Sequence, residues 1–169
     1  MKRIAILASL LLLPLCAFAE EITGEHKLID NKTIEINGQQ IRFWGLDAAD
    51  LDQICYTKGK KQRPYRCGAT SFEKIGKMLQ NQILTCKGDE RDEEGRLLAI
   101  CYSYVGRIEI EINEQMVLNG WAVSDPSQGP RYKRFENIAK RLRDGLWRGV
   151  FVMPWEWRAG NHEPPPIKD

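Results

Sequence analysis

Residues 33–50 read TIEINGQQIRFWGLDAAD and decide how the fold begins. Thr33-Ile34-Glu35-Ile36 alternates polar and apolar residues, which is typical of a half-buried strand. Asn37-Gly38 follows, a dipeptide that favours a tight hairpin turn. The chain returns in Ile41-Arg42-Phe43-Trp44-Gly45-Leu46. We therefore predict a β-hairpin, followed by a long irregular loop from Asp47 to Arg66.

The rest of the chain mixes helices and strands without regular βαβ alternation. Apolar residues at helical spacing predict helices over 69–80 and 132–144, and Asn113 is placed to cap a short helix that carries Met116 to Leu118. Ile108, Ile110 and Ile112 alternate with glutamates, which indicates a further strand or strand edge. This order favours an α+β fold in which helices pack on a small barrel rather than on a parallel sheet.

Four cysteines remain once an N-terminal leader is set aside, and their positions favour one pairing. Cys86 and Cys101 lie in apolar runs on either side of the polar turn 88–95. If these runs form a hairpin centred near Glu93 and Glu94, the two cysteines face each other within disulfide reach. The remaining pair would then be Cys55–Cys67. A four-cysteine zinc site is disfavoured because the chain has no Cys-x-x-Cys pair.

Residues 1–19 have the features of a cleaved signal peptide. Lys2 and Arg3 precede an apolar run that Pro14 interrupts, and Ala17 and Ala19 form an Ala-x-Ala cleavage pattern. A lipoprotein at Cys16 and an uncleaved anchor are the minority alternatives. We therefore expect a periplasmic or secreted protein without a stable membrane anchor, built from one domain over 20–160 and a proline-rich tail over 161–169.

Net charge gives no indication of a nucleic-acid partner. The chain has 25 Lys+Arg and 23 Asp+Glu, and removal of Lys2 and Arg3 leaves 23 of each sign. A mature protein without net charge must bind any anion through a local arrangement of cations.

The chain contains five distinctive segments in this order: Ile29 to Ile36, Ile41 to Asp50, Asp92 to Ala99, Ile112-Asn113 with Gly120-Trp121-Ala122, and Gly145-Leu146-Trp147. Together they resemble the thermonuclease (staphylococcal nuclease-like) family over roughly residues 22–148. The cysteines and the ending 151–158 resemble its cysteine-bearing, exported bacterial branch. The resemblance implies an OB-type five-stranded β-barrel with about three helices.

Members of that family cut DNA and RNA phosphodiesters with the help of calcium, and the resemblance assigns roles to four residues. Arg42 and Arg96 would hold the phosphate, because a planar guanidinium can bind two of its oxygens at once. Asp47 matches a metal-ligand carboxylate. Asp50 stands at the position of the catalytic base.

Several residues depart from the family pattern. The Asp-Gly-Asp-Thr segment reads Asp30-Asn31-Lys32-Thr33, so Lys32 replaces a calcium ligand, and an ammonium group repels a cation. Asp50 replaces a glutamate and is one methylene shorter. Glu93 and Glu94 stand where a residue that contacts the substrate is common. Past Gly120-Trp121-Ala122 the family often supplies a tyrosine, whereas the nearest one here is Tyr132.

Two functional hypotheses follow. The first is an exported phosphodiesterase for DNA or RNA with an altered metal site, in which Asp47 is the residual ligand or orients Lys32, and Lys32 contacts the substrate. Its cofactor is calcium or none. The alternative is a catalytically inactive envelope module that binds a polyanion, a glycan or a protein partner. These residues can also have purely structural roles. Arg42 and Arg96 would then be ordinary arginines on surface strands, and Asp47 would form a salt bridge with Lys32 or Arg42.

Overall fold

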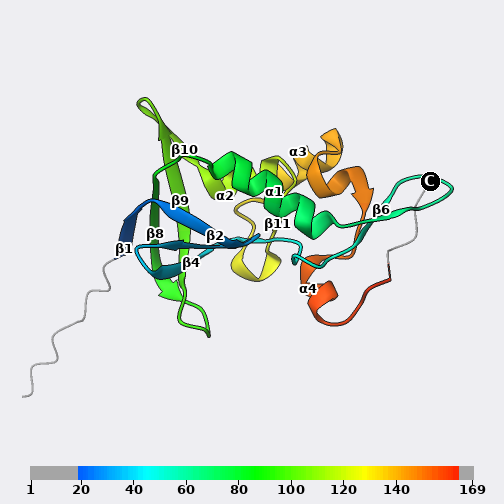
Figure 1. Ribbon diagram of the computed structural model, residues 1–169, viewed down its shortest axis with the longest axis horizontal. Coiled ribbons are helices and arrows are strands. Elements are labelled where there is room, and N and C mark those ends of the chain that lie inside the picture. Colours follow the sequence, from blue (N-terminus) through cyan, green and yellow to red (C-terminus); the bar gives the residue numbers. More distant parts are fainter. Residues whose placement is uncertain (1–18, 164–169) are drawn as a thin grey trace, which may run out of the picture.

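We describe residues 19–163 of a computed structural model (Figure 1). The predicted leader, apart from Ala19, lies outside the described residues, as does the tail from Pro164 onward. Among the described helices, none has the length and apolar character needed to cross a membrane.

The main sheet closes on itself through a single bent strand. Its hydrogen-bonded order runs β1-β8-β9-β4-β3-β2, so the path begins at β1 and ends at β2. Only Glu25 separates β1 from β2, which makes these two segments the halves of one strand. The β4–β9 pair is parallel, and the other pairs are antiparallel. The result is the five-stranded OB-type barrel that the family resemblance implied. Its segments are β1 (Glu20–Gly24), β2 (His26–Asp30), β3 (Thr33–Ile36), β4 (Gln39–Phe43), β8 (Leu84–Arg91) and β9 (Leu97–Val105).

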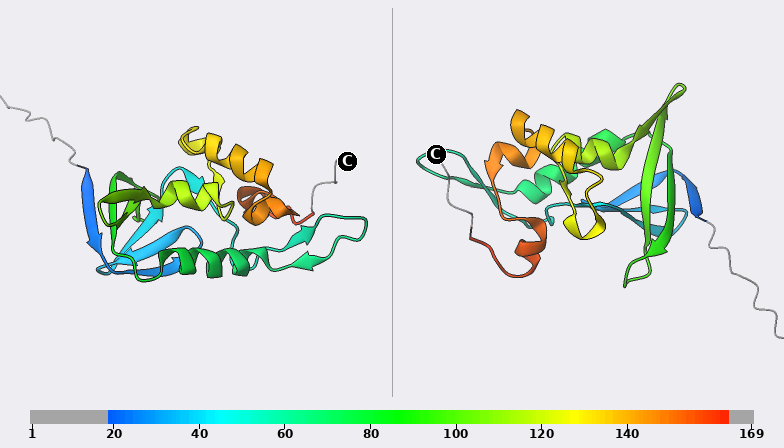
Figure 2. Two further views of the ribbon diagram at one scale, coloured as in Figure 1. Left: turned by 90° about the horizontal axis from the view of Figure 1, so that it is seen from above. Right: turned by 180° about the vertical axis from the view of Figure 1, so that it is seen from behind.

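Helices cover the barrel at one end and on opposite sides. The left view of Figure 2 places α1 on one side of the molecule and α3 on the other, with α2 between them. The predicted helices 69–80 and 132–144 are present with slightly different ends, and a short fourth helix is added near the C-terminus. The α-helices are α1 (Cys67–Leu79), α2 (Ile112–Leu118), α3 (Lys133–Leu142) and α4 (Pro154–Arg158), and the 3-10 turns are η1 (Pro126–Gln128) and η2 (Gly145–Arg148).

Short strands extend the fold beyond the barrel. The predicted strand over 108–112 is present as β10 (Ile108–Glu111), which pairs with β9. Just after the barrel strand β4, β5 (Leu46–Asp47) pairs with β11 (Val123–Ser124).

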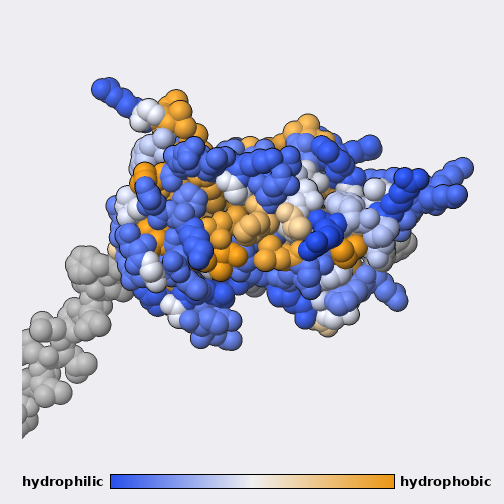
Figure 3. All heavy atoms as spheres, viewed as in Figure 1, coloured by the Kyte–Doolittle hydropathy of each residue, from blue (hydrophilic) through white to orange (hydrophobic). Residues whose placement is uncertain are grey.

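The face in Figure 3 is largely hydrophilic, with an apolar band across its middle.

The stretch from Asp47 to Arg66 is more ordered than the loop that the sequence predicted. It contains a small hairpin of β6 (Cys55–Thr57) and β7 (Pro64–Tyr65), which projects at the end of the molecule away from the barrel (Figures 1 and 2). This hairpin forms because β6 pairs with β12 (Gly149–Val150), a partner from distant sequence. The Cys55–Cys67 disulfide then fixes the hairpin to the start of α1.

Both predicted disulfides are present in the structure. Cys86 and Cys101 are directly opposite in the β8–β9 register, with their Cα atoms 4.0 Å apart. The Cα atoms of Cys55 and Cys67 are 5.5 Å apart.

The apolar interior divides into two clusters. The larger fills the barrel and the space under the helices, and Ile34, Ile41 and Phe43 in it have no exposed surface. The smaller lies beside the barrel around the Cys55–Cys67 disulfide. It consists of Ala49, Cys55, Cys67, Val123, Leu146 and Phe151, with Tyr65, Trp147, Met153 and Trp155 packed against it.

A fully buried amide joins the barrel to α2. The Asn113 Oδ1 atom accepts the backbone N–H of Cys101 at 3.0 Å. Its Nδ2 group donates to the carbonyl oxygens of Trp44, at 2.9 Å, and Ala99, at 3.1 Å. One side chain thus binds backbone groups of β9 and of the segment that follows β4, and it supplies the partner that the buried N–H of Cys101 needs.

Candidate functional site

The candidate site lies where β3 and β4 meet, at the point where the chain leaves the barrel. Thr33 at the start of β3 pairs with Arg42 near the end of β4. The backbone N–H of Phe43 donates to the Lys32 carbonyl at 2.9 Å, which holds the β2–β3 turn beside this end of β4. Asp47 follows on β5, and Asp50 lies in the loop just after it. Three segments close in sequence thus bring together residues that the sequence singled out.

Asp47 is the centre of a network of ion pairs. It is 2% exposed, and its Oδ1 atom accepts the backbone N–H of Ala48 at 2.9 Å. The Lys32 ammonium lies 3.5 Å from Asp47 Oδ1 and 3.3 Å from Asp50 Oδ1. The Arg42 guanidinium lies 3.9 Å from Asp47 Oδ1, which is too long for a hydrogen bond. Lys32, predicted to pair with Asp47 or to contact substrate, therefore bridges both carboxylates.

A fifth member of this network comes from α4 and was not predicted. The Arg158 guanidinium binds Asp47 Oδ2 through one nitrogen and lies 3.3 Å from Asp50 Oδ2 through another. Partial burial would lower the pKa of Arg158, but the hydrogen bond to Asp47 and the charges of both aspartates outweigh burial and raise it. We call Lys32, Arg42, Asp47, Asp50 and Arg158 the charge cluster.

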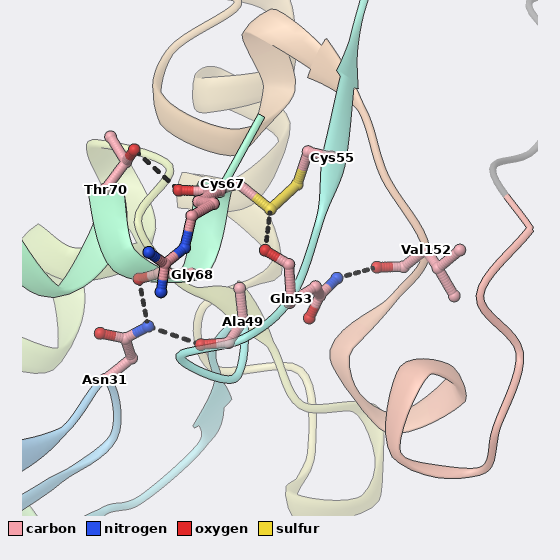
Figure 4. The surroundings of a disulfide bond; sticks show 9 residues. Asn31, Ala49, Gln53, Cys55, Cys67, Gly68, Thr70 and Val152 are labelled. Atoms are coloured by element: carbon pink, nitrogen blue, oxygen red, sulfur yellow. Dashed lines mark hydrogen bonds between the residues drawn. A yellow bond between two sulfur atoms is a disulfide. The ribbon is translucent and has the colours of Figure 1, made fainter. Parts of the chain in front are cut away.

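The smaller apolar cluster holds α4 in reach of the charge cluster. Phe151 and Trp155, on either side of the helix start, belong to it or pack against it. Gln53, which is fully buried, donates its side-chain N–H to the Val152 carbonyl at 2.8 Å (Figure 4). The ending 151–158 contributed to the family resemblance, but nothing in its composition indicated which residue would reach the site.

Asn31 is a second residue that sequence reasoning did not assign. Its buried Nδ2 group donates to the carbonyls of Ala49, at 2.6 Å, and Gly68, at 2.9 Å (Figure 4). A Cβ atom on Gly68 would lie 1.8 Å from the Asp50 carbonyl oxygen, so α1 packs directly on the loop that carries Asp50. Asn31 thus fixes the turn that carries Lys32 to both segments.

Arg96 lies on the same face of the barrel as Arg42 but pairs elsewhere. In the parallel β4–β9 pairing Arg42 is opposite Leu98, which places Arg96 two residues away on the same side. Its guanidinium binds Asp92 at 2.7 Å and Glu94 at 2.8 Å. Burial would raise the pKa of Asp92, but hydrogen bonds from the Arg96 side chain and backbone lower it. Within the described residues, Arg96 forms no ion pair with Asp47 or Asp50.

The other candidate residues make their contacts outside the charge cluster. Tyr132 is 1% exposed and donates its hydroxyl to Glu111 at 2.5 Å, so it packs in the core. Glu94 neutralises Arg96, and Trp147 and Trp155 pack on the smaller apolar cluster. His162 stacks on Trp157 with ring centroids 4.0 Å apart.

The donor set of the charge cluster does not fit calcium. Calcium takes six to eight oxygen ligands at about 2.3–2.6 Å. Over residues 19–163, no group of three or more His, Cys, Asp or Glu side chains is placed to hold a metal ion. Asp47 and Asp50 are the two carboxylates of the cluster, and Lys32 and Arg158 bind both of them. Asp30 instead accepts the backbone N–H of Lys32 at 2.8 Å.

Comparison with known proteins identifies sequence relatives of this chain. A family model described as "Staphylococcal nuclease homologue" matches residues 40–149. The succinoglycan biosynthesis protein ExoI of Rhizobium meliloti is 31% identical over 146 residues, covering 85% of this chain and 74% of ExoI. A protein of rice, Oryza sativa subsp. japonica, named "Probable staphylococcal-like nuclease CAN4", is 26% identical over 147 residues. That match covers 85% of this chain but 26% of the rice protein.

Proposed function

This chain belongs to the staphylococcal nuclease homologue family, and from that premise we propose that it binds the phosphodiester backbone of a nucleic acid without calcium. The observation that carries the proposal is the charge balance of the charge cluster. Lys32, Arg42 and Arg158 supply three positive charges against the two of Asp47 and Asp50. One net positive charge remains, which suits the single negative charge of a phosphodiester.

Arg42 is the residue of the cluster best placed to bind the phosphate. Its contact with Asp47, at 3.9 Å, is longer than a hydrogen bond, whereas Lys32 and Arg158 are held by two carboxylates each. Its side chain is 19% exposed, so part of it is accessible to solvent. A guanidinium with free donors presents the fork that matches two phosphate oxygens.

Hydrolysis of DNA or RNA without a metal is the second candidate function. It is favoured by the position of Asp50, the expected base, within the same cluster as Arg42 and Lys32. Two observations count against it. The carboxylate of Asp50 is already engaged by Lys32 and Arg158, and Arg96 is engaged by Asp92 and Glu94. Cleavage that persists in chelator and is lost in Asp50→Asn would establish this second function.

An oxidising compartment fits the proposal. Two disulfides in a domain of this size are typical of exported proteins and rare in reducing compartments. We therefore propose that the protein acts in the periplasm or the medium after removal of residues 1–19.

Arg42→Ala is expected to weaken binding of a single-stranded DNA oligonucleotide at least tenfold. A hydrogen bond to a charged group is worth roughly 1.5–3 kcal/mol, and a factor of ten corresponds to about 1.4 kcal/mol. The slope of log K against log salt should also fall by about 0.7, as expected for one lost contact to a phosphate of a single strand. Fluorescence anisotropy at several salt concentrations measures both quantities.

The matched control is Arg107→Ala, which removes an exposed arginine from the turn between β9 and β10. Affinity that falls equally in both variants would mean diffuse electrostatic attraction and would contradict the proposed site. Because the Rhizobium relative is named for succinoglycan biosynthesis, an anionic polysaccharide serves as competitor. Preference for the polysaccharide over DNA would replace nucleic acid with a glycan as the ligand.

A further inference from the structure

We propose that Lys32 and Arg158 together take over the electrostatic role of a divalent cation at Asp47 and Asp50. The inference deepens the proposed function, because it explains how the site holds its carboxylates without calcium. Its test uses no nucleic acid, so the two proposals fail separately.

Lys32 and Arg158 each contact both carboxylates, as a single ion that bridges Asp47 and Asp50 would. Lys32 contacts the Oδ1 atoms of Asp47 and Asp50, at 3.5 and 3.3 Å. Arg158 contacts the Oδ2 atoms of the same two residues. Each carboxylate is therefore bound on both oxygens, and two fixed positive charges stand against two negative ones.

Burial makes this neutralisation necessary. The side chain of Asp47 is 3% exposed and that of Lys32 is 10% exposed. A buried carboxylate without a cation is costly, and the cost is met here by side chains of the same chain. Without both partners, Asp47 would keep only the Arg42 guanidinium of the charge cluster, at 3.9 Å and beyond hydrogen-bond distance.

The two cations come from outside the part of the chain that matches the family model. That match covers residues 40–149, which includes Arg42, Asp47, Asp50 and Arg96. Lys32 precedes it, and Arg158 follows it on a segment fixed by the smaller apolar cluster and by the Gln53–Val152 hydrogen bond. The carboxylates thus belong to the matched scaffold, whereas their counterions are supplied by its two flanks.

A calcium titration of four proteins tests the inference. The proteins are the chain from Glu20 onward, its Lys32→Asp and Arg158→Gln variants, and the double variant. The double variant gathers three carboxylates and keeps Arg42, 3.9 Å from Asp47 Oδ1, as the remaining cation of the charge cluster. Isothermal titration with calcium chloride should show one saturable site. The parent and Arg158→Gln should show no saturable heat. Lys32→Asp alone should bind at least about tenfold more weakly than the double variant, because Arg158 still occupies Asp47 and Asp50.

Two variants with exposed side chains serve as controls. Lys27→Asp on β2 and Arg148→Gln in η2 make the same chemical changes outside the charge cluster and should leave calcium binding as in the parent. Calcium binding by the parent would overturn the proposal. Equal calcium affinities of Lys32→Asp and the double variant would also overturn it, because Arg158 would then not compete with calcium at Asp47 and Asp50.

Thermal unfolding of each variant accompanies the titration. A folded double variant without calcium binding would also contradict the inference. If the double variant does not unfold cooperatively, Lys32→Asn with Arg158→Gln replaces it. That pair supplies an amide oxygen in place of the third carboxylate, and a folded form without calcium binding contradicts the inference equally.

Discussion

Asp47→Asn is expected to lower the free energy of unfolding by about 3 kcal/mol, although it changes neither size nor shape. Removal of one partner from a buried ion pair costs about 3–5 kcal/mol, because the other charge is left buried without compensation. The low end applies, since Arg158 keeps 37% of its side chain exposed and water can screen part of its charge. Urea denaturation of the variant and the parent measures the difference.

Asp50→Asn is the matched control for that prediction. Its side chain is 25% exposed, against 3% for Asp47, so its loss should cost about 1 kcal/mol or less. Combining Asp47→Asn with Lys32→Met should recover part of the lost stability, because the stranded ammonium is removed. An Asp47→Asn variant no less stable than Asp50→Asn would show that the buried network is not organised around Asp47.

Asn113→Ala is expected to destabilise the protein by about 3 kcal/mol for a different reason. The substitution leaves the Cys101 N–H and the Trp44 carbonyl without their side-chain partners in the core. Each buried polar group without a partner costs about 1–3 kcal/mol. Chemical denaturation followed by circular dichroism measures the change in unfolding free energy.

Asn119→Ala controls for the loss of an asparagine side chain in the same helix region. Asn119 is exposed, and its Nδ2 group donates to the Gln115 carbonyl at 2.7 Å. Its loss should cost about 0.5 kcal/mol or less, because water replaces the bond. Equal costs at positions 113 and 119 would refute the role of Asn113 as the link between the barrel and α2.

The parts of the fold that local sequence determines could be predicted. The hairpin of β3 and β4 follows from a period of two residues and an Asn-Gly turn, both of which act within a few residues. The Cys86–Cys101 disulfide could be predicted because the two cysteines are equally far in sequence from the centre of one predicted hairpin. The closure of the barrel came instead from the family resemblance, because the bend at Glu25 depends on partners far away in the chain.

The part of the candidate site that lies within one stretch of sequence was also predictable, whereas the part that comes from distant sequence was not. Lys32, Arg42, Asp47 and Asp50 lie within one short stretch, and the structure brings them together. Arg158 is 111 residues from Asp47, and its position depends on how α4 packs on the smaller apolar cluster. No local pattern encodes such a contact. The pairing of Arg96 with Asp92 and Glu94 is local, but the family resemblance assigned Arg96 to the phosphate instead.

The most direct measurement of the central claim is the affinity for a labelled single-stranded DNA oligonucleotide in calcium and in chelator, with the same samples checked for cleavage. The fixed charges of Lys32, Arg42 and Arg158 predict equal dissociation constants within about twofold and an intact oligonucleotide in calcium. Binding that tightens tenfold or more with calcium, or cleavage that requires it, would contradict the claim that this site works without a metal.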